Sequence, residues 1–154
     1  MAKNTTVKNN MNIQMISVEK ELTQEELCRL ETEAEFSLPS DLRKFYAQHN
    51  GGIPEKKKFS KNELLYSVHK FIPILSQAGE DLKTIYSEMV LEDNVFHINC
   101  IPFAIDEGGE YFLYSMDEES FGKIFFFDSD YFDDPDESLI LLSDSFTDFL
   151  TSLR

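Results

Sequence analysis

Three consecutive phenylalanines, Phe125 to Phe127, stand in the short run KIFFFD at residues 123–128. Neighbouring side chains of a β-strand point to opposite faces of the sheet, so a strand with this sequence must bury both faces. One face at least must then be covered by other elements of the fold. We therefore predict a sheet with helices packed against it.

The chain has 154 residues, 42% of them hydrophobic, which matches one ordinary globular domain. Residues 1–12 are polar and lack periodicity, so we predict a flexible N-terminal segment before a single domain at 13–154. No apolar run reaches the roughly 18 residues of a membrane span, and no secretory signal is apparent, so we expect a cytoplasmic protein. Cys28 and Cys100 lie in helical and strand patterns and are expected to be reduced core residues.

Four segments have the signals of helices. Thr23 and Glu26 form a capping box at the start of the first. Pro39 suits the first turn of the second, which stops at Asn50 before two glycines. Apolar residues recur at helical spacing in the other two. The four predicted helices start at Thr23, run from Pro39 to Asn50, cover about Gly79 to Leu91, and cover Phe146 to Leu153 with Ser143 or Asp144 as the cap.

The remaining apolar runs predict strands. The lysine-rich stretch at 53–62 is predicted to form a loop. Asp106 to Gly109 are predicted to form a tight turn of a β-meander. The prediction is a single α+β domain with a mainly antiparallel or mixed sheet flanked by about four helices. Its strands are expected at 64–73, 96–105, 111–115, 123–128 and 139–142.

Negative charge is concentrated in the last third of the chain. Residues 106–154 hold 14 carboxylates against Lys123 and Arg154, and so carry nearly all of the net charge of −15. Eight phenylalanines in the same stretch can build a core while the acids face outward. Such a surface suits a basic partner, although negative charge also promotes the solubility of any protein. It repels nucleic acid, which we exclude as a partner despite the lysines at 56–58.

The acidic loop at 128–137 invites comparison with a calcium site. Its spacing does not fit an EF-hand, because Phe132 occupies a ligand position, Asp133 the glycine position and Leu139 that of the bidentate glutamate. No other pattern of metal ligands is present. We therefore predict no metal and no cofactor.

The sequence also lacks a readable catalytic site. Asp106, Glu107 and Glu110 cluster at a turn, but carboxylates exposed to water make poor general acids. His69 and His97 lie on different predicted strands, and no CxxC, HExxH, GxSxG or P-loop pattern occurs. We predict a protein that is not an enzyme and has no catalytic residue.

The order of several motifs resembles the SUKH superfamily. The motifs are LPSDLRKFYAQHNGG at 38–52, FIPI at 71–74, IPFAIDEGGEYFLY at 101–114, KIFFFD at 123–128 and SFTDFL at 145–150. The resemblance covers about residues 22–153, which makes 13–154 a single SUKH-like domain. Known members include bacterial toxin-immunity proteins and a Smi/Knr-like yeast regulator of cell-wall synthesis and killer-toxin resistance.

The resemblance implies an α+β domain that works by binding. It implies an immunity protein that neutralises a cognate toxin by direct contact, the toxin being a nuclease or another nucleic-acid-modifying enzyme. A basic cleft in that toxin would attract the acidic third of this chain. The alternative is a non-enzymatic regulatory module in cell-wall synthesis or signalling. We expect no membrane contact, and a monomer or weak dimer.

The partner-binding residues are expected in the acidic turns of the last third. Phe121, Tyr131 and Phe132 interrupt these turns and would supply apolar anchors, unless they fold back onto the core. The expected contact residues are Asp106, Glu107, Glu110, Asp117, Glu118, Glu119, Phe121, Asp128, Asp130, Tyr131, Phe132, Asp133 and Asp134.

Overall fold

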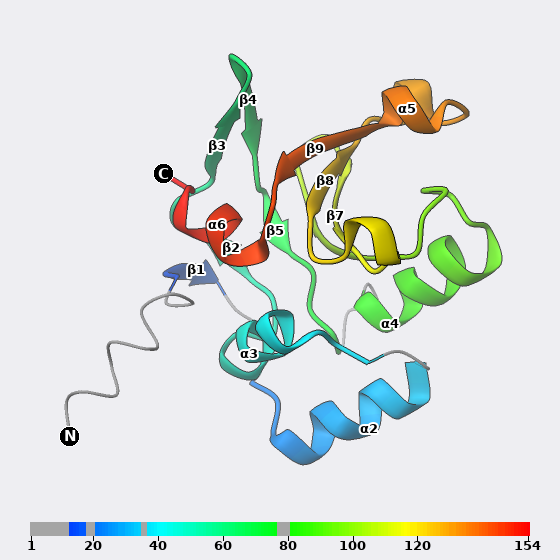
Figure 1. The fold of residues 1–154 in the computed structure, drawn as a ribbon. Coiled ribbons are helices and arrows are strands. Elements are labelled where there is room, and N and C mark those ends of the chain that lie inside the picture. Colours follow the sequence, from blue (N-terminus) through cyan, green and yellow to red (C-terminus); the bar gives the residue numbers. More distant parts are fainter. Residues whose placement is uncertain (1–12, 18–20, 35–36, 77–80) are drawn as a thin grey trace.

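The computed structural model describes residues 13–17, 21–34, 37–76 and 81–154. The predicted flexible segment, 1–12, lies outside them. The described chain forms the single α+β domain that the sequence predicts, built on an antiparallel sheet whose strands follow chain order (Figure 1). The strands of this sheet are β5 (Lys70–Phe71), β6 (Cys100–Ile105), β7 (Tyr111–Ser115), β8 (Ile124–Phe127) and β9 (Leu139–Ser143).

Strand β8 buries both faces of the sheet, as its phenylalanines predict. Phe126 packs edge-on against Phe112 at 5.2 Å between ring centroids, within the larger hydrophobic cluster. Phe127 points the other way and packs at 4.9 Å against Phe96 in a second, smaller cluster. The alternation of side chains along one strand thus builds two cores, one on each face.

Helices cover the larger core. Phe45 and Phe146, from two different helices, meet at 5.4 Å, and Phe146 also packs against Phe103 of the sheet at 5.2 Å. All three side chains are fully buried. The helices on this side are α2 (Gln24–Ala34), α3 (Ser40–Gln48) and α6 (Phe146–Thr151).

The smaller core is covered by one helical segment. Helix α4 (Leu82–Ile85) continues directly into a π-helix, Tyr86–Glu92, whose buried Tyr86 and Val90 pack beside Phe96. The predicted helix at 79–91 is therefore confirmed from Leu82 onward, with a π-helical second half. Residues 79 and 80 lie outside the described part.

The lysine-rich stretch is not a simple loop. Strand β3 (Lys58–Lys61) pairs with β4 (Leu64–Ser67) in a hairpin, and Ile53–Pro54, strand β2, pairs with β1 (Met15–Ser17). The predicted strand at 64–73 is broken in its middle because the chain changes partner there. The amide of Val68 donates to Lys57 of the hairpin, whereas that of His69 donates to Ile105 of the main sheet.

Other bounds also differ from the prediction, since α3 ends at Gln48 and α6 at Thr151. Strand β6 begins at Cys100 and not at Phe96, because His97 adopts a positive φ angle of 64° that interrupts an extended chain. The acidic loop also contains a short helix, α5 (Pro135–Ser138).

The helix ends follow local chemistry. The capping box is confirmed, because the Thr23 amide donates to Glu26 at 2.9 Å and the Glu26 amide to Thr23 Oγ1 at 3.1 Å. Pro39 precedes α3 as its N-cap and does not lie in its first turn. Ser145, and neither Ser143 nor Asp144, caps α6.

Gly51 lets the end of α3 approach the sheet. Its φ is +78°, and a Cβ atom there would lie 2.7 Å from the carbonyl oxygen of Phe71. The glycines after α3 therefore do more than stop the helix, because they bring strand β5 against it.

Candidate partner-binding surface

The acidic turns lie at both ends of the antiparallel meander. Strands β6, β7, β8 and β9 run alternately up and down, so the β6–β7 and β8–β9 connections lie at one end. We call this end, residues 106–110 and 128–134, the acidic end. The β7–β8 turn, residues 117–121, lies at the opposite end of the sheet.

Hydrogen bonds join the two connections of the acidic end. Glu110 Oε2 accepts from the backbone amide of Ser129 at 2.9 Å and from its hydroxyl at 2.8 Å. A separate bond of 2.7 Å, from His97 Nε2 to the carbonyl oxygen of Phe132, holds the longer loop against the segment before β6. The turn and the longer loop therefore form one continuous surface.

The remaining predicted contact residues are not part of that surface. At about 3.4 Å per residue, the five residues of β7 hold the two ends about 14 Å apart. Asp117 Oδ1 accepts from the amide of Asn99 at 3.3 Å. The residues at the opposite end are Asp117, Glu118, Glu119 and Phe121.

Several of the acidic side chains stabilise the turns that carry them. Asp106 Oδ1 accepts from the amides of Gly108 and Glu110, both at 2.9 Å. Asp128 Oδ1 accepts from the amide of Asp130 at 3.0 Å. Asp134 caps helix α5 by accepting from the amides of residues 136 and 137 at 3.1 and 3.4 Å. These carboxylates have a structural role whether or not they touch a partner.

Three other carboxylates of the acidic end have no such structural role in the described part of the chain. Glu107, Asp130 and Asp133 are exposed, and their side chains take part in no hydrogen bond or ion pair with the residues that the structure describes. They are the acidic groups most available to a basic partner.

The aromatic side chains of the turns face the solvent. Phe132 is 62% exposed and Tyr131 50%, both at the acidic end. Phe121 is 55% exposed at the opposite end, where its ring meets Tyr114 edge-on at 6.1 Å. None of the three is folded into the core, so each is available as an anchor for a partner.

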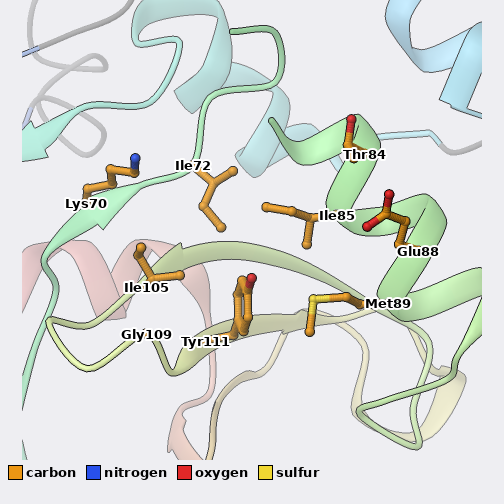
Figure 2. A pocket seen from close by; sticks show the side chains of 9 residues that line it. All are labelled: Lys70, Ile72, Thr84, Ile85, Glu88, Met89, Ile105, Gly109 and Tyr111. Carbon is orange, nitrogen blue, oxygen red and sulfur yellow. The ribbon is translucent and has the colours of Figure 1, made fainter. Parts of the chain in front are cut away.

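A pocket beside the acidic end was not foreseen from the sequence. It has a volume of about 320 Å³ and lies between the helical segment 82–92 and the ends of the strands (Figure 2). No sequence signal marks it, because its residues come from separate segments that only the fold brings together. They are Lys70, Ile72, Thr84, Ile85, Glu88, Met89, Ile105, Gly109 and Tyr111.

The chemically reactive side chains do not converge. Cys100 is buried, and burial raises the pKa of its thiol well above the usual range. Cys28 is exposed, against the expectation of a core residue, and its sulfur lies 3.2 Å from Arg43 Nη2. Within the described ranges, no group of three or more His, Cys, Asp or Glu side chains is arranged to hold a metal ion.

The fold and this surface define a single α+β domain that presents acidic and aromatic loops at one end of an antiparallel meander. The sequence model of the SMI1 / KNR4 family (SUKH-1) matches residues 21–152, and the chain belongs to this family. The resemblance to the SUKH superfamily is thereby confirmed. No curated protein and no solved structure matches the chain significantly. None of the described helices has the length and apolar character needed to cross a bilayer.

Proposed function

We propose that this protein is an immunity-type binding protein that neutralises a cognate toxin by direct contact, with residues 13–154 acting as one domain. SUKH-1 membership is consistent with an immunity role or a Smi1/Knr4-like role. The observation that favours toxin binding is the acidic end, where Glu107, Asp130 and Asp133 stand exposed beside two exposed aromatic rings.

The chemistry of that surface suits a toxin that acts on nucleic acid. Such an enzyme needs a basic cleft for the phosphate backbone. An acidic surface competes for the cleft and steers association, at rates up to about 10⁸–10⁹ M⁻¹s⁻¹ at low salt. Tyr131 and Phe132 would add the apolar contact that charge alone does not supply.

The proposed partner is therefore a protein with a basic surface. We propose no binding to nucleic acid or to a membrane. The protein would work in the cytoplasm as a monomer or weak dimer, and it would block the toxin without turning over a substrate. Binding of this kind needs no cofactor and no metal.

Co-expression tests the proposal. Cells that produce the cognate toxin domain, sought among the neighbouring genes, should survive when this protein is made with it. The two purified proteins should form a tight 1:1 complex that weakens with salt. Continued cell death together with no complex would refute the immunity role. Modest binding to several signalling or cell-wall proteins, without protection, would support the regulatory alternative.

A further inference from the structure

The pocket beside the acidic end has an apolar interior. Ile72, Ile85 and Ile105 come from three separate parts of the chain and face one space, with Met89 and Tyr111 completing the wall (Figure 2). Its volume of about 320 Å³ lies at the small end of the range of roughly 300–1,000 Å³ that is typical of ligand pockets. A single large side chain would suit it better than an extended ligand.

Two opposite charges stand at the margins of this pocket. Figure 2 shows Lys70 and Glu88 on opposite sides, with the isoleucines between them. They form no ion pair with each other, or with another residue in the described part of the chain. These charges stand at the rim, whereas the wall between them is formed by Ile72, Ile85 and Ile105. A group that enters the interior is therefore surrounded by apolar side chains, which suits an apolar occupant and would leave a charged one poorly solvated.

The pocket is continuous with the acidic end. Ile105 and Tyr111 directly flank the turn at 106–110, and Gly109 of that turn lines the pocket itself. A Cβ atom at Gly109 would meet no atom within 4 Å, so the turn is open at this position. A partner that contacts this turn would therefore also be close to the pocket.

We propose that the pocket receives one large apolar side chain, aromatic or aliphatic, that projects from the basic surface of the toxin. This inference rests on the proposed function. It assigns different roles to two parts of the interface. The carboxylates of the acidic end set the rate of encounter, and the buried apolar side chain sets the lifetime of the complex.

A variant that fills the pocket tests whether the pocket sets the lifetime of the complex. Thr84 is exposed and lines the pocket, so Thr84→Phe places a ring where the partner's side chain would lie. The complex with the toxin should dissociate roughly tenfold faster or more, with little change in association rate. Leu91→Phe is the matched control, because Leu91 is 54% exposed on the same helical segment and does not line the pocket. Its complex should dissociate at the wild-type rate.

A second measurement needs no toxin. Indole, which mimics an aromatic side chain, should shift the NMR methyl signals of Ile72, Ile85 and Ile105 in the wild-type protein, and leave the buried core residue Ile124 unchanged. Thr84→Phe should abolish these shifts.

The outcomes separate the two proposals. Absence of indole-induced shifts at millimolar concentration would overturn the inference about the pocket. Wild-type dissociation of the Thr84→Phe complex would also overturn it and leave the immunity role standing. Failure of the wild-type protein to bind the toxin at all would overturn the immunity role and, with it, the assignment of this occupant.

Discussion

His49 shows that burial can outweigh a helix dipole in setting the charge of a side chain. The residue follows α3, a position where the helix dipole favours a cation. Burial instead lowers its pKa, with Glu21 opposing the shift. Nε2 has no hydrogen-bond partner among the described residues, and the ring packs against Phe45 at 5.5 Å between centroids. Desolvation outweighs the dipole here.

A pH-dependent stability follows from the lowered pKa of His49. Below its usual pKa of about 6.5 the unfolded chain takes up a proton that the folded protein resists, so this contribution to stability is lost as the pH falls. His49→Phe keeps a ring beside Phe45 and removes the titration. Between pH 7 and pH 5, the free energy of unfolding from denaturant titrations should fall more steeply for the wild type than for the variant. Equal slopes would show that His49 does not resist protonation.

Residue roles could be predicted where the partner lies close in sequence. The capping box needs only residues three positions apart, and its geometry matches the prediction at both hydrogen bonds. The bond from the Tyr114 hydroxyl to Asp41 Oδ1, 2.7 Å long, joins residues 73 positions apart. Burial and this bond raise the pKa of Tyr114. No local sequence pattern predicts such a contact, because it forms only when the sheet and α3 have packed together.

At the scale of elements, the acidic loop after β8 is a chain of capped turns. Asp128 caps the 3-10 turn Ser129–Tyr131, and Asp134 caps α5. The loop returns to the sheet where the amide of residue 128 donates to the carbonyl oxygen of Ser138 at 2.8 Å. Asp128 and Asp134 therefore cap turns, whereas the exposed side chains of Asp130 and Asp133 between them do not. A count of charges does not distinguish these two roles.

Asp133 and Asp134 give a direct test of these roles. Asp134→Ala removes the cap of α5 and should lower the free energy of unfolding by about 1 kcal/mol. Asp133→Ala removes the same charge from a side chain without a hydrogen-bond partner in the described structure, and should stay within about 0.5 kcal/mol of the wild type. Chemical denaturation of both variants provides the comparison. Equal losses would mean that charge, and not capping, accounts for the effect.

Elements were predicted best where one pattern holds along their whole length. The three phenylalanines of β8 and the apolar spacing of α6 each led to the correct element. In the segment 64–73, one predicted strand corresponds to two observed strands. Its apolar run looks continuous, yet its backbone pairs with two different strands on either side of the 68–69 junction. The choice of partner depends on where the hairpin lies against the sheet, which the local sequence does not specify.

At the scale of the molecule, topology decides which charges act together. The sequence predicts contact residues in three acidic turns, but an antiparallel meander places successive turns at opposite ends. The β6–β7 and β8–β9 connections meet, and the β7–β8 turn lies away from them. The pocket likewise depends on the packing of the helical segment against strand ends, so its residues had no shared pattern to predict it.

The proposed function requires that the acidic end steers the protein onto a basic toxin. The most direct test is the association rate constant of two charge-reversed variants at low salt. One variant combines Glu107→Lys, Asp130→Lys and Asp133→Lys, which spares the capping residue Asp134. The matched control makes the same change in net charge at the opposite end, where strand β9 also ends, with Glu118→Lys, Glu119→Lys and Asp144→Lys.

Reversal at the acidic end should slow association with the toxin roughly tenfold or more, and raising the salt concentration should narrow the difference from wild type. The control should slow association much less, since its charges lie at the far end of the sheet. Equal slowing in both variants, or greater slowing in the control, would contradict the account and move the binding surface away from residues 106–110 and 128–134.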